Sequence, residues 1–323
     1  MSPVATLQSR ALRVRTITCL SFAITLFGVA QANHAIIYSG DAAGPRHELP
    51  FMALFSGPLP AVTSDDGVKA LEDNLAAEGY TLADVRDNGA VVPRLFLARV
   101  PANLPMLDSP SVSVRKEMFV KTLLPLILGE NEQILRDRAR LQQLSDTVES
   151  GGTPTPTDSA WLQALADRYL VEYDADEIPD LVEELLERVD VIPPSLAIGQ
   201  AALETGWGTS SAAQGQAMFG QMVFGEGEHA EVRRFERLAH AVEAYALNLN
   251  THKAYQAFRD KRLDARTRGD VPGGLDLVLT LGRYSERKMD YVHDVRGIIR
   301  ANRLQALDRA RLDTRPLQLA DGS

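Results

Sequence analysis

Glu204 is the residue whose sequence surroundings best suit acid–base chemistry. The segment before it, residues 194–203, consists mainly of small and apolar residues, and Pro194 suits the first turn of a helix because its missing N–H would have no partner there. A helix that is apolar around most of its circumference is expected to be buried. Gly206 and Gly208 follow where a helix ends through positive φ, which places Glu204 in the last turn.

Two effects are expected to raise the pKa of Glu204. Burial disfavours the charged carboxylate, and the partial negative charge at the C-terminus of a helix disfavours it further. A carboxyl group that keeps its proton at neutral pH is what a general acid needs. The alternative is an ordinary solvated glutamate at a helix end, but the apolar helix before Glu204 and the Gly-Trp-Gly sequence after it argue against free exposure.

Three nearby residues extend the candidate site. Gln200 lies four residues before Glu204, so the two polar side chains share one face of the predicted helix. Trp207 and Phe219 each have two interpretations, as a packing residue or as a flat surface against which a sugar ring lies. For Trp207 we favour packing beneath the helix.

Residues 218–235 are predicted to form two short strands around a Gly-rich turn. Glu228 and His229 are adjacent in that turn, and both are residue types that bind metal ions. A zinc site needs a third protein ligand at a suitable spacing, and none follows. We therefore expect no metal ion, and the sequence indicates no organic cofactor.

The first 32 residues have the pattern of a secretory signal. Three arginines within residues 10–15 form a basic start, residues 17–29 form an apolar stretch, and Ala30-Gln31-Ala32 is a cleavage site of the A-x-A type. Export to the periplasm or cell envelope is therefore predicted. The alternative is an uncleaved membrane anchor, although the apolar run is shorter than the ~20 residues that span a bilayer comfortably.

The rest of the 323-residue chain, which is 45% hydrophobic, is expected to form a globular protein with a sizeable core and no membrane-spanning segment. Cys19 is the single cysteine and lies in the predicted signal, so the mature chain forms no internal disulfide. Without the three signal arginines, 31 of the 34 basic residues remain against 43 acidic ones, a net charge of −12. This balance argues against a nucleic-acid partner.

The region before the candidate site is predicted to be mostly helical. Residues 1–32 precede a linker at 33–62, and residues 63–150 form the helical region. Within it, residues 91–100 read as an edge strand. Residues 113–148 have helical periodicity, and Pro125 is expected to kink or break this segment, giving two helices in sequence.

Gly, Thr and Pro in residues 151–157 form the clearest linker, which we take as the main domain boundary. The alternative is that the long helices before it pack on the domain that follows. That domain is predicted to span residues 158–305, with a charged, frayed tail at 306–323. Its predicted helices cover residues 158–171, 177–188, 194–205, 239–249, 275–281 and a last helix from 284.

The segment Gln200-Ala201-Ala202-Leu203-Glu204-Thr205-Gly206-Trp207-Gly208 resembles the A-Q-A-A-x-E-S-G-W-G signature of the bacterial Bax-type proteins of the glucosaminidase superfamily (glycoside hydrolase family 73). The resemblance runs from about Trp161 to Asn302. Thr205, Met218 and Ala241 depart from the usual Ser, Leu and Ser without removing the acid. Further matching segments are residues 185–193, 218–220, 248–252 and 284–287.

The resemblance implies a mainly α, lysozyme-like helical domain with a small β-hairpin lobe, preceded by the N-terminal helical region. It implies a peptidoglycan hydrolase that cleaves the β-1,4 bond after N-acetylglucosamine, with Glu204 as the proton donor. Tyr284 would line the cleft, and the hairpin would supply a second carboxylate. The candidates for that carboxylate are Glu226, Glu228 and Glu231, although flexible acidic turns are common. The residues expected to contact substrate are Gln200, Trp207, Phe219, Gly220 and Tyr291.

The identity of the second catalytic group stays open at this point. An inverting enzyme needs a base, a retaining enzyme needs a nucleophile, and the acetamido group of the substrate can replace either. A lytic transglycosylase acting on the same polymer is one alternative function, although no Gly-Leu-Met-Gln-type segment follows the Glu. A catalytically inactive wall-binding protein is another.

Overall fold

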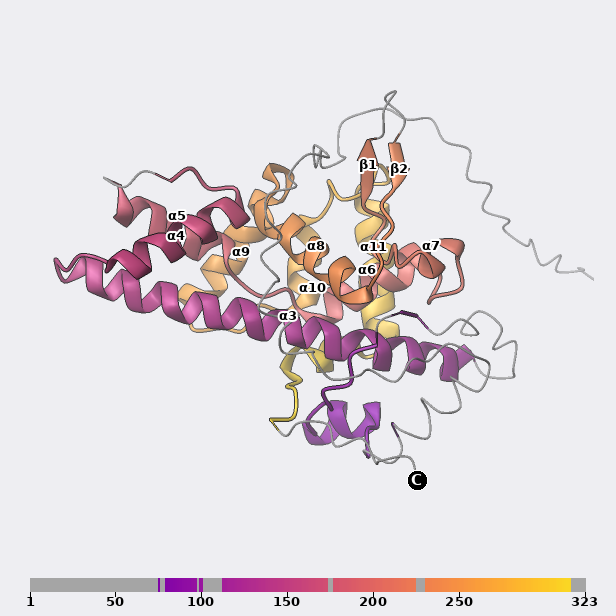
Figure 1. Cartoon of the computed structure of the whole chain (residues 1–323). Coiled ribbons are helices and arrows are strands. Elements are labelled where there is room, and N and C mark those ends of the chain that lie inside the picture. Colours follow the sequence, from indigo (N-terminus) through magenta and orange to yellow (C-terminus); the bar gives the residue numbers. More distant parts are fainter. Residues whose placement is uncertain are drawn as a thin grey trace, which may run out of the picture. The chain divides into compact units, whose positions relative to one another are not determined.

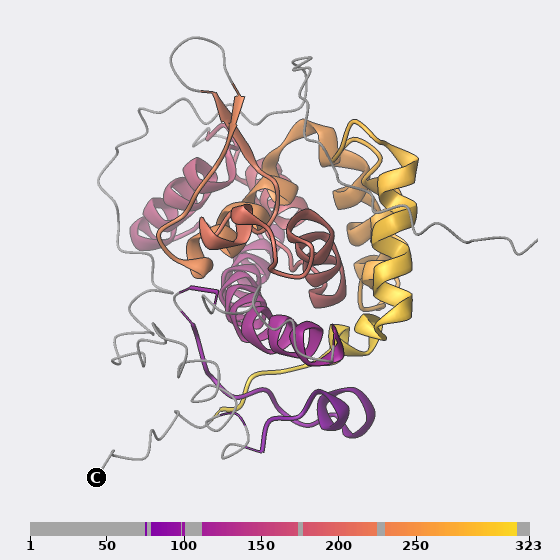
Figure 2. The same cartoon turned by 90° about the vertical axis from the view of Figure 1, so that its right-hand side faces the viewer.

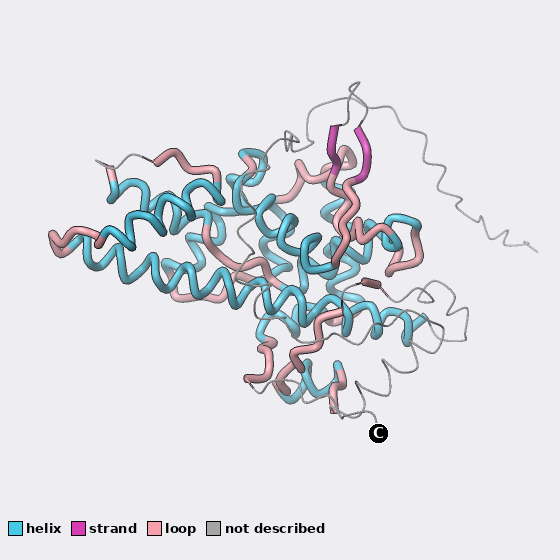
Figure 3. The backbone as a smooth tube through the Cα atoms, in the orientation of Figure 1, coloured by secondary structure: helices cyan, strands magenta, loops and turns pink. Residues whose placement is uncertain are grey.

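A computed structural model describes residues 75, 79–97, 99–100, 112–173, 177–224 and 230–314. This part of the chain is mainly helical, with one two-stranded sheet (Figures 1 and 3). Within it no helix combines the length and the apolar composition needed to cross a membrane. The elements are η1 (Asp84–Asn88), α3 (Val112–Glu149), α4 (Pro156–Tyr169), α5 (Ile178–Arg188), α6 (Pro194–Thr205), α7 (Ser211–Gln214), β1 (Met222–Phe224), β2 (Ala230–Val232), α8 (Leu238–Thr251), η3 (Lys253–Tyr255), α9 (Gln256–Thr267), α10 (Gly274–Leu277), η4 (Val278–Thr280), α11 (Met289–Ala301) and η5 (Leu304–Arg309).

Helix α3 is one continuous helix of 38 residues with Pro125 inside it, so the predicted break at Pro125 is wrong (Figure 1). A proline in a helix interior costs ~3 kcal/mol because it removes a hydrogen bond and crowds the preceding turn. Leu123, Leu124, Ile127 and Leu128 around it are buried, and α3 packs on α5, α6 and α8. Apolar burial on both sides of Pro125 outweighs the local cost.

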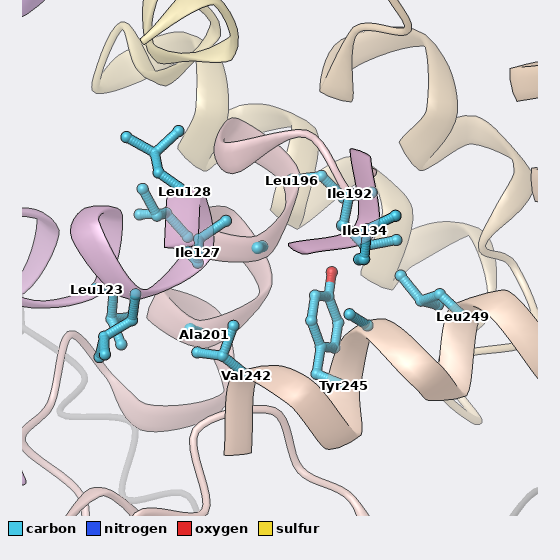
Figure 4. Close-up of a cluster of buried hydrophobic side chains, with 14 of the residues drawn as sticks. Leu123, Ile127, Leu128, Ile134, Ile192, Leu196, Ala201, Val242, Tyr245 and Leu249 are labelled. Atoms are coloured by element: carbon cyan, nitrogen blue, oxygen red, sulfur yellow. The ribbon is translucent and has the colours of Figure 1, made fainter. Parts of the chain in front are cut away.

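Helix α6 forms the centre of this packing. It contacts α3, α10, α11 and η5, and Figure 4 shows its side chains among those of α3 and α8. Gly199 lies so close to α11 that a Cβ there would be 2.9 Å from Cγ1 of Ile299. Figure 2 shows α11 (yellow) along one side of the described bundle and α3 (magenta) below it. The predicted burial of this helix is confirmed.

The segment after α11 also holds α6 in place. Leu304 and Leu307 of η5 are fully buried, and the Asp308 carboxylate accepts hydrogen bonds from the backbone N–H of Ser195 (2.8 Å) and of Gly274 (3.0 Å). These bonds satisfy amide groups at the N-termini of α6 and α10, which lack partners within their own helices. The prediction of a frayed tail from residue 306 onward is therefore wrong for residues 306–314, which are part of the packed structure.

The predicted strand at residues 91–100 is wrong, because among the described residues of this range only Val92 forms a bridge. It pairs with Leu312, and Pro93 beside it has no N–H to extend the pairing. Arg94 donates to the backbone oxygen of Asp313 (2.6 Å) and pairs with Glu132 of α3 (3.0 Å). The N-terminal segment therefore packs on both α3 and the end of the chain. Helix α3, which precedes residues 151–157, contacts α5, α6 and α8, which follow them, and the chain does not separate into two compact units at these residues.

A buried ionic cluster fixes the turn that leads into α6. Asp190 is 1% exposed and Arg262 of α9 is fully buried. Arg266 donates to both Asp190 oxygens (3.0 and 2.7 Å), while Arg262 lies 3.7 Å away and Arg138 of α3 lies 3.9 Å away. Arg262 also donates to the backbone oxygen of Asp190 and to Asn250 of α8. This cluster joins α3, α8 and α9 at the entry to the central helix.

A second, partly buried ionic cluster surrounds Arg168 of α4. Its guanidinium lies 3.3 Å from Glu243 of α8, 3.6 Å from Glu130 of α3 and 4.0 Å from Asp137 of α3. Burial raises the pKa of Glu130 to about 7, against an ordinary value of 4.5, although Arg168 opposes the shift. Three carboxyl groups share one cation here, so the cluster holds more negative charge than the guanidinium balances.

We expect Glu130→Gln to change the pH dependence of stability. Because the folded pKa is raised, the wild type loses stability as pH rises from about 4.5 through about 7, and the neutral amide avoids this loss. The free energy of unfolding of the variant relative to wild type should increase by about 3 kcal/mol between pH 4.5 and pH 8. Urea unfolding at the two pH values measures this difference. A difference that stays constant with pH would contradict it.

Candidate active site

Glu204 lies in the last turn of α6, and the chain reverses direction immediately after it. Gly206, Trp207 and Gly208 all have positive φ (57°, 61° and 82°), and the N–H of Gly206 bonds the carbonyl oxygen of Ala202. Trp207 is unusual in this group, because residues with a Cβ rarely adopt positive φ. The tight reversal keeps the end of α6 within the protein, and the Glu204 side chain is only partly exposed.

The electrostatic setting of Glu204 agrees with that of a general acid. Burial raises the pKa of its carboxyl group, and this effect exceeds two opposing ones, a hydrogen bond from Tyr291 and the positive charge of Arg287. The net shift favours the protonated form relative to an ordinary glutamate. The predicted direction of the shift is thus confirmed, with desolvation as its main cause.

The backbone at Gly220 lies directly against the Glu204 carboxyl group. A Cβ at position 220 would lie 2.6 Å from Oε2 and 3.0 Å from Cδ of Glu204, and φ at this position is +61°. Any side chain would therefore clash with the carboxyl group and strain the backbone. Gly220 immediately precedes the hairpin, so it brings the base of the hairpin to the acid.

A hydrogen-bond relay of Tyr245, Gln200 and Tyr291 leads to Glu204. The Tyr245 hydroxyl donates to Oε1 of Gln200 (2.6 Å), and Nε2 of Gln200 donates to the Tyr291 hydroxyl oxygen (2.9 Å). Tyr291 therefore has its own proton free to donate to Glu204. The three relay residues are at most 2% exposed. Gln200 and Tyr291, predicted as substrate contacts, are thus placed behind the acid, where they orient it.

We expect Tyr291→Phe to move the alkaline limb of the activity profile to higher pH. The phenol stabilises the charged carboxylate, so its removal raises the pKa of Glu204. A hydrogen bond to a charged group contributes about 1.5–3 kcal/mol, so kcat should also fall roughly tenfold or more. The measurement is kcat/KM against pH, with Tyr173→Phe as a control tyrosine outside the relay. Profiles that coincide for Tyr291→Phe and wild type would contradict the relay.

Tyr284 lies beside the relay and is partly exposed. Its hydroxyl donates to the backbone oxygen of Phe219 (2.7 Å), and its ring stacks on Tyr291 with centroids 5.5 Å apart. Phe219 is 1% exposed and stacks on Tyr245 at 4.0 Å. Of the two interpretations for Phe219, packing is therefore the one that the structure supports. Through Phe219, Tyr284 also fixes the backbone next to Gly220.

Two comparisons bear on what this arrangement is. The family model described as mannosyl-glycoprotein endo-beta-N-acetylglucosaminidase matches residues 179–304. "Protein bax" of Escherichia coli (strain K12) is 32% identical over 189 residues, which are 56% of this chain and 68% of that protein. The chain belongs to the Bax-type proteins of the glucosaminidase superfamily. No solved structure shows a significant match. The matched residues 179–304 include Glu204, Gly220 and the whole relay.

The hairpin lobe expected of a glucosaminidase-superfamily domain is present. Strands β1 and β2 pair antiparallel, with Val223 opposite Glu231, as the sequence pattern of two short strands predicts. Glu231 is described and exposed. Glu226 and Glu228 lie outside the described residues, so the choice among the three carboxylates stays a prediction. Among described residues no group of three His, Cys, Asp or Glu side chains is placed to hold a metal ion.

Trp207 packs against α3 in this glucosaminidase-superfamily domain. Its ring meets Phe119 edge-on at 5.7 Å, and the Lys116 ammonium lies 4.7 Å from the ring centroid. Both contacts support packing as its main role, although the ring stays partly exposed.

Two residues of the site were not among the sequence-based candidates, Tyr245 and Arg287. Tyr245 lies in the predicted helix at residues 239–249. The available signal was its hydroxyl, which needs a hydrogen-bond partner when the ring is buried.

Proposed function

We propose that this protein is an exported peptidoglycan hydrolase that cleaves the β-1,4 bond after N-acetylglucosamine, with Glu204 as general acid. Its membership of the glucosaminidase superfamily supports glycosidase chemistry. One observation carries the assignment of the acid. The Glu204 carboxyl group has a raised pKa, is held by Tyr291 and lies against the Gly220 backbone, so its protonated form is favoured and its position is fixed.

In the proposed step, Glu204 gives its proton to the glycosidic oxygen as the bond to the anomeric carbon breaks. An unprotonated alkoxide is a poor leaving group, and a positioned acid typically accelerates such a step by about 10²–10⁴-fold. Glu204 becomes a carboxylate in this step. Tyr291 then donates a hydrogen bond to the new negative charge, and Arg287 stabilises it electrostatically. The relay therefore favours the state that the reaction produces.

The positive charge that develops on the sugar requires a second group. We propose a carboxylate of the hairpin lobe for this role, with Glu226, Glu228 and Glu231 as candidates. A separation of about 5–5.5 Å between the two carboxyl groups would give retention, and one of about 6.5–9.5 Å would leave room for water and give inversion. The acetamido oxygen of the substrate can serve in place of a protein nucleophile.

The predicted signal at residues 1–32 supports the proposal that the protein acts in the periplasm or cell envelope, where peptidoglycan lies. Glycan strands are then its partner, and no nucleic acid is implied by its acidic composition. No cofactor enters the proposed step, because both catalytic roles are filled by carboxyl groups or by the substrate.

Digestion of purified peptidoglycan followed by mass spectrometry tests this function. Wild type should release fragments with reducing N-acetylglucosamine ends, Glu204→Gln should release almost none, and the exposed-residue control Glu236→Gln should match wild type. Fragments with anhydromuramic ends would assign a lytic transglycosylase instead. An intact polymer that still binds the protein would assign a wall-binding role without catalysis.

A further inference from the structure

A cavity of about 390 Å³ lies at the opposite end of α11 from Tyr291. Its lining comes from η1, from the first turns of α3, from the end of α11 and from Trp207. This volume is at the small end of the range for ligand sites, about 300–1,000 Å³, so it suits one or two residues of a ligand rather than a glycan chain. None of the residues that form the relay to Glu204 lines it.

Positive charge dominates the lining of this cavity. Arg86, Lys116 and Arg303 contribute three cations, against the single carboxylate of Glu117. Glu117 is already paired with Lys121 at 2.9 Å. The described lining therefore has an excess of cations facing a common space, which an anion would neutralise.

Arg86 has an unsatisfied donor in this set of cations. Its side chain is half-buried, its Nε atom is buried without a hydrogen-bond partner, and burial together with the nearby charge of Arg303 lowers its pKa. Arg303, by contrast, is paired with Asp87, and Lys116 donates to Oδ1 of Asn302 (3.1 Å). A buried guanidinium N–H without an acceptor is costly, and a carboxylate or a phosphate fits its planar fork.

The other walls of the cavity also favour a negatively charged ligand group. Val112 and Ser113 line the cavity at the start of α3, whose first turn contains no acidic side chain. The N-terminus of a helix carries a partial positive charge that favours anions. Trp207 supplies an apolar, aromatic face, which suits the alkyl part of an amino acid or the face of a sugar ring.

We propose that this cavity binds the carboxylate of a short peptide attached to the glycan substrate, with Arg86 and Arg303 as its main contacts. The source of the peptide rests on the proposed function, because peptidoglycan strands carry peptides with free carboxylates. Trp207 joins the cavity to the catalytic helix, since it follows Glu204 by three residues through the turn at Gly206–Gly208. Recognition of the peptide and placement of the acid thus depend on the same end of α6.

Calorimetric titration of the full chain carrying Glu204→Gln tests the proposal without turnover. The probes are a muramyl dipeptide with free carboxylates, the same compound with its carboxylates amidated, and inorganic phosphate. Adding Arg86→Gln should weaken binding of the free dipeptide about tenfold or more, as expected for the loss of a charged hydrogen bond. The control is Arg300→Gln, which removes an exposed charge from α11 outside the cavity. Arg300→Gln should leave binding of the free dipeptide unchanged. The amidated compound should bind the Glu204→Gln protein weakly, with an affinity no higher than that of the free dipeptide for the protein that also carries Arg86→Gln.

Two results would overturn the assignment. Equal binding of the dipeptide to the Arg86→Gln and Arg300→Gln proteins would remove Arg86 from the site. Binding of phosphate as tight as that of the dipeptide, with the same loss in Arg86→Gln, would make the cavity a general anion site. These binding measurements do not depend on glycan cleavage. A protein that binds the peptide but hydrolyses no glycan would therefore contradict the proposed function and leave the peptide site in place. The urea midpoint of Arg86→Gln shows whether the variant is folded.

Discussion

Glu204→Gln is expected to lower kcat for peptidoglycan hydrolysis by about 10²–10⁴-fold while the protein stays folded. The amide has the same shape as the carboxyl group but has no proton to donate to the leaving oxygen. Its burial carries no charge penalty, whereas burial raises the pKa of the native carboxyl group. Stability at pH 8 should therefore equal or exceed that of wild type. Release of reducing ends measures the rate, and thermal unfolding measures the stability.

The control for this prediction must remove a glutamate without touching the site. Glu236→Gln fits, because Glu236 is exposed and lies beyond the hairpin. It should keep wild-type kcat. If Glu204→Gln retained more than a tenth of the wild-type rate while remaining folded, the proton would have to come from another group, and the site would need a new acid.

The catalytic helix was predictable because its signals are local. Pro194 at the start, an apolar circumference and Gly206 at the end determine the bounds and burial of a helix within one short segment. The position of Glu204 in its last turn follows, and so does the direction of its pKa shift. The hairpin is also local, because the two segments that pair are close neighbours in the sequence.

The parts that sequence reasoning missed depend on contacts between distant residues. Gln200 was recognised beside Glu204 from its spacing of four, but its two hydrogen-bond partners are 45 and 91 residues away. The contact of Gly220 with the acid likewise joins two segments that no local pattern links. For Pro125, local propensity predicted a break, and the tertiary burial of the residues around it decided otherwise.

The difference between local signals and distant contacts also matters for function. A helix can present a carboxyl group by local rules alone, but its pKa and orientation are set by what the remainder of the chain packs around it. In this protein α8 supplies Tyr245, α11 supplies Tyr291 and the segment before β1 supplies Gly220. Glu204 is therefore recognisable from sequence as a candidate, while the evidence that it is held and tuned as an acid comes from the fold.

Asp190→Ala is expected to be the most destabilising single change among those considered, with a loss of about 3–5 kcal/mol in the free energy of unfolding. Burial alone would raise the pKa of Asp190, but Arg262, Arg266 and Arg138 outweigh it and keep the carboxylate charged. Its removal leaves Arg262, which is fully buried, without its counter-charge. An uncompensated charge in the interior is among the costliest defects that a point mutation can create.

Urea unfolding at pH 7 measures this loss, and Asp264→Ala provides the matched control. Asp264 also pairs with an arginine, Arg268, but both side chains of that pair are exposed, so its removal should cost no more than about 0.5 kcal/mol. Similar losses for the two variants would contradict a structural role for the buried cluster. Because the pKa of Asp190 is lowered, the pH-dependent part of its contribution should be lost as pH falls below about 4, so the difference between the two variants should narrow in acid. Since Asp190 lies four residues before Pro194, loosening this cluster should also disturb the helix that carries Glu204.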